Sequence, residues 1–278
     1  MSFHVFVTGA TGFVGTAVVQ ELLQAGHHVT GLARSDAAAQ QLTTAGASSP
    51  PRRRRRRRDH PHHDFAAYEA TCEADAKIIR ALGDALLGTS KLLIVTSATP
   101  TIVSGSHRQD ETATTQDSHN PRKVAEAAVD AVAATGVRVV VVRLPPSVHG
   151  DGDRAFVPLL IGIAREKGVS AYIGNGANRW PAVHRLDAAV LFRLVLEKAT
   201  TSGAAHAVAD QGVTLRELAA VIGKRLNVPV VSKDPLEATD HFGWFNYFAG
   251  LDNPIASAWT QETYGWKPTQ KSLLEDLD

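Results

Sequence analysis

The chain has little sulfur and no long apolar stretch. Its 278 residues include one cysteine, Cys72, and one methionine. A single cysteine excludes an internal disulfide and is typical of a reducing compartment. No apolar run reaches the roughly 18 residues of a membrane span, and no secretory signal precedes the first apolar segment. These absences predict a soluble cytoplasmic protein with no membrane partner.

Acidic residues outnumber basic ones once a single arginine-rich segment is set aside. The run Arg52 to Arg58 supplies seven of the 29 basic residues, and losing these seven charges would take the formal net charge from +1 to −6. The rest of the chain is therefore acidic, and no nucleic-acid partner is expected. The twelve histidines lack the spacing of a closed metal site, so no metal is expected either.

What the chain does have is a glycine-rich turn between a strand and a helix. Residues 3–7 are apolar enough for a buried strand, TGATGFVG follows at 8–15, and residues 16–23 show helical spacing. Gly9 allows a tight turn, Gly12 lets a pyrophosphate approach, and Gly15 allows close packing. Free N–H groups at a helix N-terminus bind phosphate. Unless this is an ordinary strand-to-helix turn, the sequence predicts a dinucleotide site formed by Gly9, Thr11, Gly12, Phe13, Val14 and Gly15.

The G-x-x-G-x-x-G spacing resembles the extended short-chain dehydrogenase/reductase family, the NAD-dependent epimerase/dehydratase group. The resemblance continues in RLPPSVHG at 143–150, WPAVHRLDAA at 180–189 and TYGWKP at 263–268, with a gap between about residues 46 and 62. It implies an α/β fold. Residues 1–150 would form a Rossmann-type, doubly wound parallel sheet that binds NAD(P). Residues 151–278 would complete the sheet and form a small C-terminal α/β substrate lobe.

The end of the second predicted strand bears on the choice between NAD and NADP. An acidic residue there would bind the ribose 2′-hydroxyl of NAD. Position 33 is alanine instead, and Arg34 and Ser35 follow. Arginine can pair with a 2′-phosphate, and the serine can add a hydrogen bond. These residues favour NADP as the cofactor; if Arg34 is only a surface residue at a helix start, NAD stays open.

The family's catalytic Tyr-x-x-x-Lys is missing. Four residues after the four tyrosines, at 68, 172, 247 and 264, stand Cys72, Gly176, Leu251 and Pro268. In the family the lysine lies four residues before a helical glutamate.

Counting back from Glu126 puts Arg122 at the lysine position and Ser118 at the tyrosine position. Arg122 can hold a ribose or phosphate, but it cannot relay a proton at neutral pH.

Ser97 matches the family's catalytic serine or threonine. It would hydrogen-bond a substrate carbonyl or, alternatively, satisfy backbone groups at the strand end. The resemblance therefore assigns catalysis to Ser97 and Arg122. His149 and His184 match positions near the nicotinamide and the lobe junction, where a lone histidine is usually structural.

Residues 46–62 lack any strand pattern, although a Rossmann half needs a third strand, a crossover helix and a fourth strand there. Seven like charges repel, which favours a solvated disordered loop. A polyanion-binding arm is a second interpretation, and a segment read out of frame is a third. We expect a sheet shortened on this edge, with exposed apolar side chains and association as a homodimer. Adenine binding should also be weak.

The favoured function is an NADP-dependent oxidoreductase or epimerase-like enzyme that acts on a small carbonyl or hydroxyl substrate. The alternatives are a non-catalytic NADP-binding regulatory protein and an inactive paralogue. An intact glycine motif is compatible with all three, whereas the missing tyrosine weakens only the first.

Overall fold

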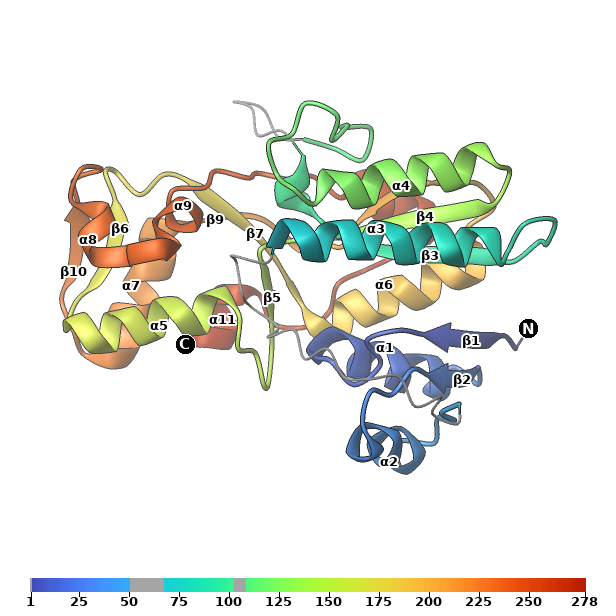
Figure 1. Cartoon of the computed structure of the whole chain (residues 1–278). Helices are drawn as coiled ribbons and strands as arrows, with labels where there is room; N and C mark the ends of the chain where they lie inside the picture. Colours follow the sequence, from blue (N-terminus) through green and yellow to red (C-terminus); the bar gives the residue numbers. More distant parts are fainter. Residues whose placement is uncertain (1, 51–67, 103–108) are drawn as a thin grey trace.

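A computed structural model describes residues 2–50, 68–102 and 109–278, and helices and strands alternate along most of this length (Figure 1). The arginine run and the rest of residues 51–62 lie outside the described part. The first half contains β1 (His4–Val7), α1 (Phe13–Gln24), β2 (His28–Gly31), α2 (Asp36–Thr44), α3 (Tyr68–Asp84), β3 (Leu92–Ala98), the 3-10 turn η2 (Thr99–Thr101), α4 (Lys123–Ala134) and β4 (Arg138–Leu144).

The second half carries shorter strands and closes with several short helices. It contains β5 (Ser147–His149), α5 (Phe156–Lys167), β6 (Ser170–Ile173), β7 (Arg179–His184), α6 (Arg185–Lys198), β8 (Gly203–His206), β9 (Asp210–Thr214), α7 (Leu215–Leu226), β10 (Val230–Lys233), α8 (Ala238–Phe242), η3 (Gly243–Phe245), α9 (Asn246–Ala249), α10 (Ala258–Tyr264) and α11 (Leu273–Leu277). None of the described helices is long and apolar enough to cross a bilayer.

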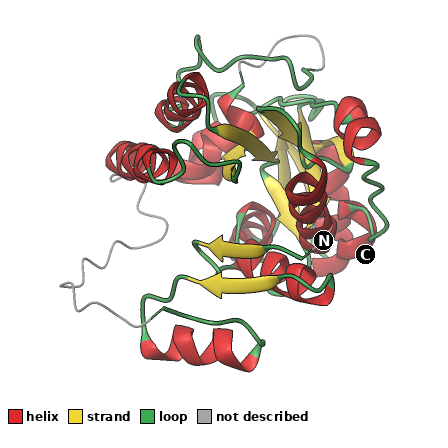
Figure 2. Ribbon diagram, turned by 90° about the vertical axis from the view of Figure 1, so that its right-hand side faces the viewer, coloured by secondary structure: helices red, strands yellow, loops and turns green. Residues whose placement is uncertain are grey.

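The Rossmann-type sheet is divided into two parts. β1 pairs with β2, and β3, β4 and β8 form a second group; all of these pairings are parallel. Within the described residues β1 and β3 do not pair, and Figure 2 shows the two-stranded part apart from the other strands. A doubly wound sheet places further strands beside its first one. The predicted α/β fold is confirmed, and the sheet is interrupted beside β1.

One strand-like contact lies where none was predicted. Ser48 forms a parallel bridge with Thr30, its N–H donating to the Val29 carbonyl at 2.9 Å. The expectation that residues 46–62 contain no strand pairing is therefore wrong at Ser48. Two apolar side chains in this region are exposed: Phe6 on β1 is 51% exposed and Leu32 is 42% exposed.

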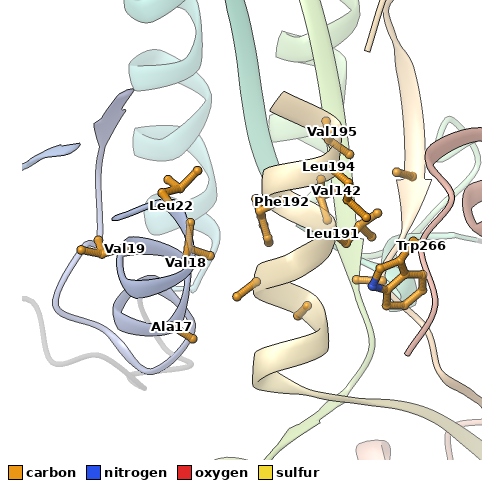
Figure 3. Packing of buried hydrophobic residues seen from close by; sticks show 14 of the residues in the cluster. Ala17, Val18, Val19, Leu22, Val142, Leu191, Phe192, Leu194, Val195 and Trp266 are labelled. Atoms are coloured by element: carbon orange, nitrogen blue, oxygen red, sulfur yellow. The ribbon is translucent and has the colours of Figure 1, made fainter. Parts of the chain in front are cut away.

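The main core lies between the sheet and two neighbouring helices. α1 and α6 run side by side, and their facing side chains include Val18 and Phe192 (Figure 3). α3 and α4 cover the other face of β3 and β4 (Figure 1). Trp266 of the TYGWKP segment is fully buried, and its indole N–H donates to the Asp187 carbonyl at 2.9 Å. Two of the segments that resemble the family, 180–189 and 263–268, therefore meet in the core.

The C-terminal half has a separate aromatic core. Phe245 is fully buried, and its ring lies 5.2 Å from that of Phe156 and 6.0 Å from that of Trp180. The segment 240–251, to which Phe245 belongs, therefore covers this C-terminal core. Sequence periodicity missed three strands here: β5 has only three residues, β7 contains Pro181, and β9 contains Gly212. α4 begins at Lys123, with Pro121 in the preceding turn.

Candidate cofactor and catalytic site

The glycine turn is compact, and its shape depends on the absence of side chains. Gly9 has a φ of +65°, and its carbonyl accepts from the Gly12 N–H at 2.9 Å. A Cβ on Gly15 would lie 2.0 Å from that same carbonyl oxygen. Gly15 is thus required by the turn itself rather than by packing on the sheet. α1 begins at Phe13, with no acidic residue in its first turn and no side chain capping its first N–H groups.

Arg34 and Ser35 lie where β2 passes into α2. Arg34 is exposed, and Ser35 is the N-cap of α2, its Oγ accepting from the Ala38 N–H at 3.1 Å. The cap uses the hydroxyl oxygen as an acceptor, so its hydrogen can still be donated to a phosphate oxygen. Ser35 rather than Asp36 therefore caps α2.

Ser97 lies at the carboxyl end of β3, one residue before the strand ends. Its side chain is almost completely buried, and its Oγ has no hydrogen-bond partner among the described residues. A buried hydroxyl without a partner costs about 1–3 kcal/mol of desolvation. The alternative role for Ser97, satisfying backbone groups at the strand end, is therefore not what the structure contains.

Arg122 is held next to Ser97. It is the N-cap residue of α4, and its Nη2 donates to the Thr96 carbonyl at 2.8 Å and to Asp75 Oδ2 at 3.2 Å. The structure therefore brings Ser97 and Arg122 to one end of β3. Ser118, at the family's tyrosine position, is buried, and its Oγ accepts from the Asn120 N–H at 3.2 Å.

The phenol group of Tyr68 comes to this end of β3 from α3. Tyr68, the first residue of α3, donates its hydroxyl to Asn120 Oδ1 at 3.2 Å. Asn120 also donates to the Pro100 carbonyl at 3.4 Å, just beyond β3. Burial raises the pKa of Tyr68 to about 12, although nearby Arg122 opposes the shift. Sequence analysis missed Tyr68 because a search for Tyr-x-x-x-Lys spacing tests one helix only.

The two histidines lie together at the junction with the C-terminal half. His149 Nδ1 lies 2.9 Å from Asp276 Oδ2, and the His149 and His184 rings are 5.3 Å apart in an edge-to-face arrangement. His184 Nδ1 accepts from the Leu186 N–H at 3.3 Å and caps α6. Burial lowers the pKa of His184. Both rings thus have structural contacts.

The sequence of this chain is similar to those of known proteins. Residues 5–53 match the NAD dependent epimerase/dehydratase family. An uncharacterized protein of Schizosaccharomyces pombe is 46% identical over 288 residues, covering 99% of this chain and 98% of that protein. This chain belongs to the NAD-dependent epimerase/dehydratase family. A second family relative, an uncharacterized protein of Saccharomyces cerevisiae, is 40% identical over 98% of this chain and 97% of its own.

Solved structures agree with the epimerase/dehydratase family fold. A dTDP-glucose 4,6-dehydratase from Streptomyces venezuelae, solved with NAD, matches with a TM-score of 0.72 at 17% identity and covers 100% of this chain and 94% of its own. A human epimerase family protein solved with NADPH matches with a TM-score of 0.70 at 21% identity. The match covers 100% of this chain and 98% of the human chain. One of these two neighbours thus binds NAD and the other NADPH.

Proposed function

We propose that this protein is an NADP-dependent oxidoreductase or epimerase-like enzyme acting on a small carbonyl or hydroxyl substrate. The observation that carries the proposal is the buried hydroxyl of Ser97, which has no partner among the described residues and lies beside Arg122, in a fold whose neighbours bind nicotinamide cofactors. A polar group kept buried without a partner is typical of a functional site. Arg34 and Ser35 support NADP over NAD.

The residues present fit a dinucleotide. The glycines of the Gly9–Gly15 turn have no side chains to cover the backbone. The free N–H groups of the first turn of α1 can donate hydrogen bonds to a pyrophosphate. Arg34 and the hydroxyl of Ser35 would hold the 2′-phosphate. A bound nicotinamide would supply or accept hydride.

The chain's own groups would handle the substrate oxygen. Ser97 Oγ has a hydrogen to donate to a carbonyl oxygen, and the Arg122 guanidinium lies close enough to the strand end to stabilise negative charge on it. The Tyr68 phenol is the neighbouring proton donor, since its raised pKa keeps it protonated at neutral pH. The same raised pKa makes it a weak acid, which favours slow turnover.

A non-catalytic NADP-binding regulator, or an inactive paralogue, is the second candidate. The observation that favours it is Ser118, a serine where the family has its tyrosine, together with an arginine in place of the lysine. Such a protein would keep cofactor binding and lack turnover.

The test is NADPH oxidation, followed by absorbance, against a panel of small aldehydes and ketones, with NADP reduction by the matching alcohols. Turnover that falls in Ser97→Ala while NADPH affinity is retained would support the enzyme. Binding of NADPH without turnover across the panel would support the regulator. A wild-type protein that binds neither NADPH nor NADH would refute both.

A further inference from the structure

α1 and α6 begin at the same end of the molecule. They pack side by side in parallel, with Ala17 and the start of α6 toward one end and Leu22 and Val195 toward the other (Figure 3). The N-terminus of α1 is the end that carries the glycine turn. The positive ends of two helix dipoles therefore lie near each other.

The guanidinium group of Arg185 lies near the N-termini of α1 and α6. Arg185 is the first residue of α6, and its Cζ lies 5.1 Å from the ring centroid of Phe13, the first residue of α1. Phe13 belongs to the glycine turn, so a residue from the second half of the chain is seated on the proposed cofactor loop. A cation over an aromatic face is attracted by the negative face of the ring.

The carboxylates of the described residues form no ion pair with this guanidinium. Among the described residues Arg185 has no ion pair, and the first turn of α1 contains no acidic residue. Asp187, in the first turn of α6, is buried, and its two oxygens accept from the N–H groups of Thr269 and Gln270 at 3.0 Å each. A cation next to two positive helix ends is unfavourable unless an anion binds between them.

We infer that Arg185 is a phosphate-binding residue, which contacts the pyrophosphate of the dinucleotide held by the glycine turn. The inference rests on the proposed function and adds a side chain to a site otherwise made of backbone N–H groups. Stacking on Phe13 holds the guanidinium plane and leaves its N–H edge free for phosphate oxygens. Cofactor binding then connects α6, and His184 before it, to the nucleotide-binding half.

The experiment is titration calorimetry of the full chain with NADPH, ADP-ribose and inorganic diphosphate. Arg185→Gln removes the charge, and Arg185→Lys keeps it without the planar fork. Arg216→Gln is a matched control, because Arg216 also lies in the first turn of a helix, with its Cζ 5.3 Å from the Tyr172 ring in the other core. Thermal unfolding verifies that each variant folds.

We expect Arg185→Gln to weaken all three ligands by on the order of tenfold or more, as for loss of a charge-assisted bond. Arg185→Lys should restore part of the loss, and Arg216→Gln should bind like the wild type. Raising the salt concentration should weaken binding less in Arg185→Gln than in the wild type. Wild-type affinity in folded Arg185→Gln would overturn the inference alone. A wild type that binds neither NADPH nor ADP-ribose would overturn the proposed function as well.

Discussion

Arg143 and Glu126 form a buried ion pair that fastens β4 to α4. Arg143 Nη2 donates to Glu126 Oε2 at 2.7 Å and Nε donates to Oε1 at 3.0 Å, with each side chain only 6% exposed. Arg143 also pairs in register with Ser97, and Glu126 lies one helical turn after Arg122. The ion pair therefore sets the distance between the strand end and the helix that carry the candidate catalytic residues.

Breaking this pair from one side should destabilise the fold strongly. Arg143→Met leaves the Glu126 carboxylate buried without its partner, for which we expect a loss of about 3–5 kcal/mol in the free energy of unfolding. Arg179→Met is the control, because its ion pair with Asp252 is more than one third exposed and should contribute at most about 1 kcal/mol. Urea unfolding measures both, and equal losses would contradict the prediction.

His206 lies against the same guanidinium. Its Nδ1 lies 2.9 Å from the Ala256 carbonyl, to which it donates, so Nε2 can accept from Arg143 Nη1 at 3.3 Å. Burial lowers the pKa of His206, and the neighbouring Arg143 adds to this effect. The histidine is neutral in the fold, because a proton on Nε2 would face the guanidinium.

Stability should therefore fall in mild acid. The pKa values of His184, His206 and His241 are all lowered, chiefly by burial, so the unfolded chain takes up protons first. Their contribution is complete above about pH 6.5, the ordinary histidine value, and is lost as the pH falls below it. Urea unfolding between pH 8 and 5 should show this decline. His206→Asn should flatten it, and an unchanged slope in that variant would count against the assignment.

Local signals in the sequence predicted local structure well. The strand, glycine turn and helix predicted over residues 3–23 depend on a few adjacent residues, and all three are present. Ser97 and Arg122 lie at one end of β3, because the end of this strand and the start of α4 are close together in the fold. These features can be predicted without knowing which residues distant in the sequence are in contact.

Features that depend on contacts between distant segments were missed. Tyr68 and Asn120 meet only because α3 and α4 pack together, 52 residues apart in sequence. The bridge of Ser48 to Thr30 needs only two residues, too few for a periodic pattern. Arg185 reaches Phe13 across 172 positions, and no motif spacing links them.

Cofactor preference is tested at Arg34. NADPH should bind the wild type more tightly than NADH, and Arg34→Ala should lose about 1.5–3 kcal/mol of NADPH binding while NADH affinity hardly changes. The reason is that only NADPH carries the 2′-phosphate that an arginine can bind. Calorimetric titration of both cofactors measures the difference. Equal affinities in the wild type would refute the preference.

Ser97 should matter for activity and not for stability. Ser97→Ala removes a buried hydroxyl that has no partner among the described residues, so the free energy of unfolding should stay the same or rise slightly. Turnover, once a substrate is found, should drop by on the order of a hundredfold, as for loss of a donor to a reacting oxygen. Tyr172→Phe is the control, since β6 belongs to a different sheet. A folded, cofactor-binding Tyr172→Phe without activity would show that the proton donor is misplaced.

The open face of β1 should drive self-association. Val5 and Val7 pack on the core, whereas Phe6 points away with 51% of its surface exposed, and His4 and His28 stack beside it at 4.7 Å. We propose a homodimer through this face. Phe6→Thr keeps a strand-forming residue but removes the apolar surface, and should shift light scattering toward the monomer mass. Leu236→Thr changes an equally apolar side chain, 91% exposed and remote from β1, and should leave the mass unchanged. If Phe6→Thr associates as the wild type does, the interface lies elsewhere.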